Sequence, residues 1–403
     1  MFKHVKKAPA DPIFGLNEAF KNETSPNKIN LVVGVYKNED GDTPILECVK
    51  KAEKILLEKE KTKSYLSIQG TEEYTNTVKE LILGKGSSVL AANRAATVQS
   101  PGGTGALRIA ADFIHKFLPK SKIWLSDPTW ENHRQVFNSA GIETAFYPYY
   151  NAKTKWLYFD GLIETLLKIP SRDVVLFHAC CHNPTGVDIS KDQWEVIAKI
   201  AFEKGFLVLF DFAYQGFGNG LDEDAFAIRL FADKIKNFMI SNSFSKNFGL
   251  YNERVGALTV VTENSDEAEK VLSQLKICIR VNYSNPPGHG SSIVTTIISN
   301  TELKKLWMDE LKEMRDRIHD YRQKLVNTLK EKGVKQNFDF IMKQRGMFSY
   351  TGLTPEQVNK LREKYALYMV STGRINLAGI NAKNIDKIAQ AISEVIKIRV
   401  SVL

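Results

Sequence analysis

The chain has 403 residues, of which 43% are hydrophobic and 25% are charged, and it carries a formal net charge of +9. These values are those of an ordinary globular protein, and single cores seldom grow beyond about 250 to 300 residues, so we expect one large domain and one smaller domain. The lysines are interspersed with glutamates along 50–63 and 302–335, which indicates solvated helix surface and no nucleic-acid partner.

The chain begins with a predicted N-terminal arm. This arm contains one short helix, with Asp11 as its cap and Pro12 at its first position, and is followed by a strand over Ile29–Tyr36. Two helices are predicted next, one opened by Thr43 and one running from a cap at Thr71 to a stop at Gly84.

Short apolar runs then alternate with longer amphipathic segments. The runs predicted as strands are 95–98, 123–126, 142–147, 174–178, 207–210, 238–240 and 257–261. The segments predicted as helices are 104–118, 130–140, 160–168 and 190–204. This alternation predicts an α/β fold with a mostly parallel central sheet flanked by helices.

The C-terminal part has a different pattern. Apolar residues recur at helical spacing from Leu303 to Leu329 and predict a long helix that bridges two domains. Beyond Gly333 we expect strands at 338–342 and 347–350 and helices at 355–365 and 385–398. The predicted division is an N-terminal arm with part of the small domain at 1–43, a large domain at 44–305, and the bridging helix with a small C-terminal domain at 306–403.

Several classes of protein are disfavoured by what the sequence does not contain. The four cysteines, Cys48, Cys180, Cys181 and Cys278, have no metal-ligand spacing, so we expect no metal site and a reducing compartment. No apolar run approaches the roughly 20 residues of a membrane span, and the first residues lack the hydrophobic core of a signal peptide. We therefore expect a cytoplasmic protein without membrane association, while a short organelle signal stays open.

The stretch from Ser241 to Gly256 contains one lysine, Lys246, between two apolar runs. Hydroxyl and cationic donors surround it, namely Ser243, Ser245 and Arg254. Such donors are suited to holding an anion beside a reactive amine. The alternative is a solvated loop whose lysine has no chemical role.

Other polar residues lie at the ends of predicted strands, where open sheets of this class bind ligands. Gly103 and Thr104 lie in a glycine turn before a helix, where free amides and the helix dipole favour an anion, although the spacing is neither a Walker nor a dinucleotide motif. Taken singly, each of these residues has an ordinary explanation as a turn, a cap or a core group. The others in this class are Trp130, His133, His178, Asn183, Asp211 and Tyr214.

Together these residues provide what pyridoxal phosphate requires of a protein. The cofactor needs a lysine for covalent attachment, a carboxylate at its ring nitrogen, hydrogen bonds to its phenolic oxygen, a phosphate cup and a stacking aromatic ring. The predicted roles are attachment by Lys246, ring-nitrogen pairing by Asp211, phenolic-oxygen contacts by Tyr214 and Asn183, and phosphate binding by Gly103, Thr104, Ser243, Ser245 and Arg254.

With these motifs the chain resembles the aspartate aminotransferases, which are class I pyridoxal phosphate enzymes of fold type I. The resemblance covers nearly the whole chain, from Ala-Pro-Ala-Asp-Pro at 8–12, through Ser-Phe-Ser-Lys-Asn-Phe-Gly-Leu-Tyr at 243–251, to Ser-Thr-Gly-Arg-Ile-Asn at 371–376. It implies a large cofactor-binding domain, a smaller α+β domain built from the N- and C-terminal parts, and a homodimer with active sites at the subunit interface. The implied reaction is a reversible ping-pong transfer of the amino group from L-aspartate to 2-oxoglutarate, giving oxaloacetate and L-glutamate.

The resemblance also assigns roles that the residues alone do not. It implies that Lys246 carries a proton between the substrate Cα and the cofactor C4′ and that Arg374 binds the substrate α-carboxylate as a bidentate pair. Arg280 would reach the distal carboxylate in the partner subunit's site, and Tyr65 would reach the phosphate across the interface. The remaining implied positions are Trp130 over the cofactor ring and beside the substrate, Gly34 and Asn183 beside the substrate, and His133 and His178 behind Asp211.

One departure from the family pattern and two alternatives accompany this interpretation. Phe244 stands where many relatives have tyrosine, which removes a hydroxyl near the cofactor, and we expect tuning of activity and not its loss. A broad-specificity aromatic and dicarboxylic aminotransferase stays open, because Arg280 does not exclude aromatic substrates. A catalytically silent protein that binds nucleic acid through its basic surface is the second alternative, and the complete cofactor set argues against it.

Overall fold

The structure is a computed structural model that describes residues 1–8 and 13–397. The chain forms two compact units. Unit 1 comprises Met1–Thr43, Pro184–Gly186 and Arg317–Leu403, and unit 2 comprises Pro44–Asn183 and Val187–Asp316. The second boundary falls within the long helix α13 (Thr301–Glu331). The three-part division predicted from the sequence stays a prediction.

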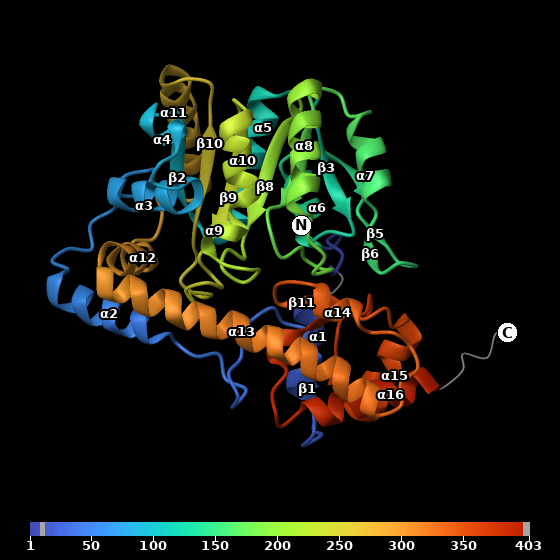
Figure 1. Cartoon of the computed structure of the whole chain (residues 1–403). Coiled ribbons are helices and arrows are strands. Elements are labelled where there is room, and N and C mark those ends of the chain that lie inside the picture. The colour runs from blue at the N-terminus through green and yellow to red at the C-terminus, as the bar shows by residue number, and fades with distance from the viewer. Residues whose placement is uncertain (9–12, 398–403) are drawn as a thin grey trace. The chain divides into compact units, whose positions relative to one another are not determined.

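Unit 2 is built on a seven-stranded sheet with the order β2-β10-β9-β8-β7-β3-β4 (Figure 1). The strands β9, β8, β7, β3 and β4 are parallel, and β10 runs antiparallel to both of its neighbours. The predicted mostly parallel central sheet is thus confirmed. The strand bounds are β2 Ala95–Pro101, β3 Lys122–Asp127, β4 Glu143–Pro148, β7 Val174–His178, β8 Leu207–Phe212, β9 Phe238–Ser243 and β10 Val255–Val261.

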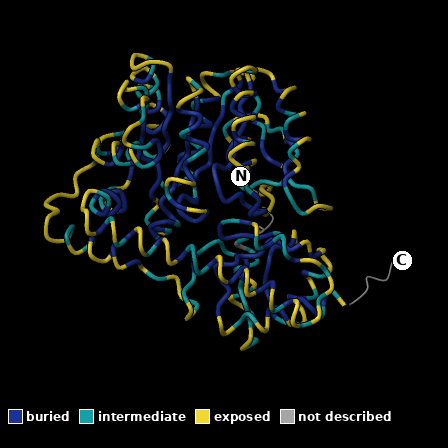
Figure 2. The backbone as a smooth tube through the Cα atoms, viewed as in Figure 1, coloured by how far each residue is buried: buried dark blue, intermediate teal, exposed yellow. Residues whose placement is uncertain are grey.

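The sequences of the central strands are almost continuously apolar, because helices cover both faces of the sheet. Every residue of β7, β9 and β10 is buried. Helix α5 (Gly102–Phe117) packs on β2, β8, β9 and β10 and contributes Leu107 and Ile114 to a core shared with Val98, Leu125 and Leu258. Figure 2 shows the strands as buried tubes beneath helices whose outer faces are exposed. This core holds the strand ends in fixed register.

The other helices of unit 2 are largely where their local signals place them. Thr71 accepts a hydrogen bond from the Tyr74 amide and Gly84 ends the helix with φ 85°, as predicted for α3. Helices α9 to α12 lie in segments for which no helix was predicted. The remaining elements of unit 2 are α2 Glu47–Lys59, α3 Glu72–Leu83, α4 Ser88–Ala91, α6 Asn132–Ser139, β5 Tyr150–Asn151, β6 Trp156–Leu157, α7 Phe159–Leu166, α8 Lys191–Lys204, α9 Leu221–Asp224, α10 Phe226–Lys234, α11 Ser265–Asn282 and α12 His289–Ser299.

The predicted start of the first helix in unit 2 is wrong. Helix α2 begins at Glu47, not at Thr43. Its first amides bind a distant side chain, because the Glu310 carboxylate accepts from the Glu47 amide at 2.6 Å and from the Cys48 amide at 3.0 Å. A carboxylate on α13 therefore caps this helix. For this reason the sequence around Glu47 contains no local capping signal for the helix start.

Unit 1 contains two small two-stranded sheets and several helices. Strand β1 (Ile29–Asn30) pairs in parallel with β12 (Leu367–Tyr368), and β11 (Phe348–Tyr350) pairs antiparallel with β13 (Arg374–Asn376). A buried cluster of Val32, Ala366, Tyr368 and Val370 packs against Leu16 and Phe20. The helices are α1 Phe14–Asn22, α14 Phe340–Lys343, α15 Pro355–Tyr365, the 3₁₀ turn η1 Leu377–Gly379 and α16 Ile385–Lys397. The predicted cap at Asp11 and Pro12 lies outside the described residues.

Two strand predictions in unit 1 are wrong. Only Ile29 and Asn30 of the predicted strand 29–36 are in a ladder, because the carbonyls of Val33 and Val35 accept hydrogen bonds from the side-chain amide of Asn376. Residues 338–342 form a turn and the helix α14, since the amides of Ile341 and Met342 bond back to the carbonyls of Phe338 and Asp339. Of the helices within 1–8 and 13–397, none has the length and apolar character of a membrane span.

Candidate active site

Polar side chains of unit 2 gather where its parallel strands end. His178 ends β7, and it lies opposite Asp211 of β8, which in turn lies opposite Ser241 of β9. Carboxyl ends of parallel strands share one edge of a sheet, so residues far apart in sequence meet there. The strand-end positions of Asp211 and His178 that the sequence predicted are therefore brought together.

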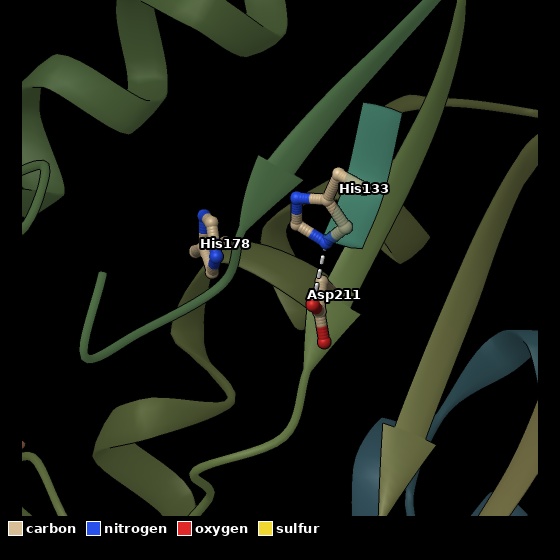
Figure 3. A group of neighbouring side chains, drawn as sticks. All are labelled: His133, His178 and Asp211. Carbon is tan, nitrogen blue, oxygen red and sulfur yellow. Dashed lines mark hydrogen bonds and ion pairs between the residues drawn. The ribbon is translucent and has the colours of Figure 1, made fainter. Parts of the chain in front are cut away.

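A chain of hydrogen bonds begins at the Asp211 carboxylate. Its Oδ2 atom lies 2.9 Å from His133 Nε2 (Figure 3). The other ring nitrogen, His133 Nδ1, lies 2.8 Å from Thr129 Oγ1. His133 comes from the first turn of α6 and is fully buried, and Asp211 is 7% exposed. Because buried charge is costly unless it is hydrogen-bonded, His133 is the group that makes a carboxylate tolerable at this depth.

The pKa values of Asp211 and His178 are both lowered, but for different reasons. Burial opposes the charge of Asp211, but the hydrogen bond from His133 and nearby positive charge outweigh it, so the pKa of Asp211 lies below its ordinary value. Burial lowers the pKa of His178 to about 3, although the Asp211 charge partly opposes that shift. At neutral pH the site therefore holds an ionised aspartate beside a neutral histidine.

Lys246 lies in the turn that follows β9. Its Nζ atom lies over the ring of Tyr214, 4.7 Å from the centroid, and Tyr214 itself is 5% exposed. Desolvation lowers the pKa of the Lys246 amine to about 8, the Asp211 charge opposes this, and the Arg254 charge adds to it. A lysine with this pKa is partly neutral near physiological pH and can act as a nucleophile or a base.

An anion cup adjoins the lysine turn. Ser243 Oγ donates to Ser245 Oγ at 3.1 Å, and Arg254 Nη1 donates to Ser245 Oγ at 3.3 Å. The guanidinium lies against the first residue of α5, since a Cβ on Gly102 would be 2.4 Å from Arg254 Nη2. Glycine is therefore required there for the arginine to approach the helix end.

The N-terminus of α5 forms the other side of this cup. In the part of the chain that the structure describes, its N-cap residue, Pro101, makes no side-chain cap hydrogen bond, and Gly103 and Thr104 lie in its first turn. A Cβ on Gly103 would lie 3.2 Å from Ser243 Cβ, which shows how closely the turn and β9 approach. Free amides, two serine hydroxyls and a guanidinium together have the chemistry of a phosphate site.

Trp130 lies beside the Asp211 cluster, and Asn183 is a buried residue of the same unit. The Trp130 ring meets His133 edge-on with centroids 5.2 Å apart. Asn183 is 6% exposed and follows the buried loop after β7. Phe244 packs edge-on against Tyr74 and Phe248 in an aromatic cluster.

Tyr65 and Arg280 are placed differently from the other predicted residues of unit 2. The side chain of Tyr65 is 93% exposed. Arg280 is also exposed, at the C-terminal end of α11, where its Nη1 donates to Ser284 Oγ. In a single chain these two residues therefore lie on the surface and not in the buried cluster.

Gly34 and Arg374 belong to unit 1. Arg374 is 3% exposed, its Nη2 donates to the Val32 carbonyl at 2.8 Å, and its guanidinium lies 4.4 Å from the centroid of the Phe348 ring. The same ring lies against Gly34, because a Cβ on that glycine would be 2.5 Å from Phe348 Cζ. Phe348 thus contacts both predicted substrate-binding positions of this unit.

His182 is a buried polar residue at this site that the sequence analysis did not identify. Its Nε2 lies 2.9 Å from Ser126 Oγ, its ring stacks on Tyr149 with centroids 3.9 Å apart, and it lies 4.5 Å from the His178 ring. Burial and the neighbouring histidines hold the pKa of His182 well below its ordinary value. No spacing in the sequence marks it, because the residues between His178 and His182 form bends after β7 and not a helix.

Among the described residues, two groups of side chains have ligand atoms close enough to surround a cation. His133, His178 and Asp211 form one group, and Cys180, Cys181 and Asp224 form the other, each with all ligand atoms within 4.8 Å. In the first, Asp211 is already bonded to His133. In the second, Asp224 accepts hydrogen bonds from the amides of Gly216, Gly218 and Asn219. Both carboxylates therefore have protein partners.

Comparisons with known proteins agree with the chemistry of this site. The family model for "Aminotransferase class I and II" matches residues 26–392. The chain is 52% identical over 396 residues to an aspartate aminotransferase of Escherichia coli (strain K12), covering 98% of this chain and 100% of that protein.

Two solved structures show the same fold. One is an aromatic-amino-acid aminotransferase from Burkholderia pseudomallei covalently bound to pyridoxal phosphate, with a TM-score of 0.96, 50% identity and coverage of 98% of this chain and 99% of that one. The other is an aspartate aminotransferase from Saccharomyces cerevisiae cytoplasm, with a TM-score of 0.96, 38% identity and coverage of 98% of both chains. The chain described here belongs to the class I and II aminotransferase family and has the fold type I architecture of its pyridoxal phosphate enzymes.

Proposed function

We propose that the chain is a pyridoxal phosphate-dependent aspartate aminotransferase. It would transfer the amino group of L-aspartate to 2-oxoglutarate in a reversible ping-pong reaction that gives oxaloacetate and L-glutamate. The observation that carries the proposal is the pairing of an amine of lowered pKa, Lys246, with a buried ionised carboxylate, Asp211, at the ends of adjacent strands. The identity to an aspartate aminotransferase over 98% of the chain supports the choice of substrate.

The residues present fit pyridoxal phosphate. The phosphate would be held by Ser243, Ser245, Arg254 and the uncapped α5 turn at Gly103 and Thr104, where the close approach at Gly102 leaves no room for a side chain. Lys246 would bind the aldehyde carbon covalently, and Tyr214 and Asn183 would bond to the phenolic oxygen. Trp130 would cover the ring, and Tyr65 would reach the phosphate from the partner subunit. The structure neighbour from B. pseudomallei binds the same cofactor covalently.

Residues of the chain would transfer the proton and stabilise the charge during the reaction. When bound, pyridoxal phosphate accepts the electron pair left at the amino acid Cα on loss of its proton. Lys246, with a pKa of about 8, would take that proton and return it at the cofactor C4′. Asp211 would keep the ring nitrogen protonated through a charge-assisted hydrogen bond, and His133 and His178 would support Asp211 from behind.

Substrate recognition would depend on two arginines. Arg374 would pair with the α-carboxylate, beside Gly34, and Arg280 would pair with the distal carboxylate in the partner subunit's site. The resemblance to the aspartate aminotransferases is the reason that we assign both to a neighbouring subunit, and the exposure of Arg280 and Tyr65 in the single chain is compatible with that assignment. We therefore propose a homodimer with its active sites at the subunit interface.

The proposal extends to domain roles and location. Residues 44–305 would form the cofactor-binding domain, and residues 1–43 and 306–403 would form the arm, the bridging helix and the small domain. The yeast neighbour is a cytoplasmic enzyme, and its likeness supports a cytoplasmic location for this chain.

A broad-specificity aromatic and dicarboxylic aminotransferase is the second candidate. It is favoured by the 50% identity and TM-score of 0.96 to the aromatic-amino-acid aminotransferase from B. pseudomallei. The cofactor-binding residues of unit 2 would serve either enzyme, because they would bind the cofactor and not the substrate side chain.

A substrate panel tests the proposal. Steady-state rates on aspartate, tyrosine and phenylalanine, each with 2-oxoglutarate as acceptor, are compared as kcat/KM. We expect the highest value for aspartate, while equal or higher values for the aromatic substrates would establish the second candidate. No transamination of any of the three by protein with bound cofactor would contradict both.

A further inference from the structure

Arg322 is a buried cation in unit 1 that none of the roles above includes. It lies on α13 and is 1% exposed. Its Nη2 donates to the carbonyls of Gly346 at 2.6 Å and Phe348 at 2.8 Å. Its Nη1 donates to the Ile341 carbonyl at 3.2 Å and to Ser349 Oγ.

The acceptors at Gly346, Phe348 and Ser349 share one feature: they lie where the chain enters β11. Gly346 has φ 77° and lies in the bend before the strand, and Phe348 and Ser349 are its first two residues. A planar guanidinium fixes the direction of each carbonyl that it binds, and hydrogen bonds from a charged donor are worth more than neutral ones. Arg322 therefore sets where β11 begins and how Phe348 is oriented.

Phe348 connects the start of β11 to Arg374 through its ring. The two strands pair so that Phe348 lies opposite Asn376 and Tyr350 lies opposite Arg374. The Phe348 ring lies 4.4 Å from the Arg374 guanidinium, a distance within the range of cation–π contact. Its far edge fills the space where any side chain at position 34 would lie. One ring thus fixes the guanidinium on one side and excludes a side chain at Gly34 on the other.

We propose that Arg322 is a positioning residue for substrate carboxylate binding, acting through the carbonyl of Phe348 and the ring that lies beneath Arg374. The inference rests on the proposed role of Arg374. It adds that the orientation of that guanidinium depends on a second, buried arginine that does not touch the substrate.

The test compares holoenzyme variants with a matched control. Arg322→Met removes the guanidinium at similar length, Arg322→Lys retains a cation that cannot make the forked contacts, and Phe348→Leu removes the ring alone. Arg317→Met is the control, because Arg317 lies on the same helix and unit but binds Glu39 and the Ile380 carbonyl and not β11. KM for aspartate, kcat, and the Kd of succinate measured by calorimetry are the readouts, together with the cofactor absorption spectrum and the thermal midpoint.

We expect KM and the succinate Kd to rise by roughly 10-fold to 100-fold in Arg322→Met, as for a binding group displaced by about 1 Å. Phe348→Leu should show a similar rise, and Arg322→Lys a smaller one. kcat should fall less than kcat/KM, and the cofactor spectrum should match that of the wild type. Arg317→Met should change the thermal midpoint without changing either binding constant.

Two outcomes overturn the inference. One is a KM and Kd in Arg322→Met that equal those of the Arg317→Met control. The other is an unchanged succinate Kd in Phe348→Leu. This second variant keeps the inference testable if Arg322→Met does not fold. Arg374→Ala distinguishes failure of the proposed function from failure of the inference. Unchanged succinate binding in Arg374→Ala contradicts the proposed role of Arg374 itself. Weaker succinate binding in Arg374→Ala together with unchanged binding in Arg322→Met contradicts only the role of Arg322.

Discussion

The lowered pKa of Lys246 predicts that this lysine destabilises the cofactor-free protein at neutral pH. Its amine has a pKa of about 8 in the folded chain against an ordinary value of 10.5. Between these two values the unfolded chain binds a proton that the folded chain does not, so stability rises with pH over that window. Below about pH 8 the amine is charged in both states, and the folded state bears the full cost of desolvating it.

The magnitude follows from the two pKa values. One unit of pKa is worth about 1.4 kcal/mol, so the fall from 10.5 to about 8 corresponds to a cost of at most about 3.5 kcal/mol. The contact with the Tyr214 ring favours the charged amine and therefore reduces this cost. Replacing Lys246 with methionine keeps most of the apolar stem and removes the charge. We therefore expect Lys246→Met to raise the free energy of unfolding at pH 7 by up to about 3.5 kcal/mol.

The measurement is urea unfolding of cofactor-free protein at several pH values from 7 to about 10, chosen to cover the linkage window. The gain in Lys246→Met over the wild type should be greatest at pH 7 and should shrink as the pH approaches 10. Lys61→Met serves as the control, because Lys61 is exposed and its replacement should leave stability nearly unchanged. A Lys246→Met variant that is less stable than the wild type at pH 7, or a gain that is independent of pH, would refute the reasoning.

Three further predictions concern the same site. Lys246→Ala should abolish the covalent cofactor absorption and nearly all transamination, and full turnover in this variant would disprove its assignment. Arg280→Asp should lower kcat/KM for dicarboxylates and raise it for cationic amino acids, so an unchanged substrate ranking would show that another residue reads the distal carboxylate. His133→Ala should destabilise the protein by about 3 to 5 kcal/mol, because it leaves the buried Asp211 charge without its hydrogen bond, while His133→Asn should lose less by retaining a donor. Equal unfolding free energies for the two His133 variants would mean that the bond to Asp211 contributes nothing.

The elements that could be predicted from sequence are those whose ends are set locally. The α3 helix has its cap at Thr71 and its stop at Gly84, and the structure places both as predicted. The start of α2 could not be predicted, because its cap, Glu310, lies 263 positions from Glu47 in the chain. The segment 31–36 likewise looks like a strand by composition, but the side chain of Asn376 takes the hydrogen bonds that a neighbouring strand would otherwise make.

The same distinction applies to the candidate site. Asp211 and Lys246 were predictable because a parallel sheet places the residues after its strands at one edge, and the sequence marks those strands by their apolar runs. His182 and Arg322 were not, since each acts through a contact that no spacing encodes: a ring stacked on Tyr149 and a guanidinium bonded to the carbonyls before β11. Prediction from sequence thus identified groups that carry the chemistry more readily than groups that orient them.

The buried polar groups of unit 2 differ in charge state although all of them are buried. Burial opposes every charge there, yet it has three different outcomes: His178 loses its proton with a pKa of about 3, the Lys246 amine titrates at about 8, and Asp211 keeps its charge with a lowered pKa. The difference lies in hydrogen bonding, because the Asp211 carboxylate receives His133 at 2.9 Å while His178 Nδ1 has no hydrogen-bond partner among the described residues. A single negative charge therefore remains fixed beside an amine that can gain or lose a proton near neutral pH. This is the combination that an acid–base reaction at an amino acid Cα requires, and it is encoded by the strand-end positions of the sheet and by one histidine from α6.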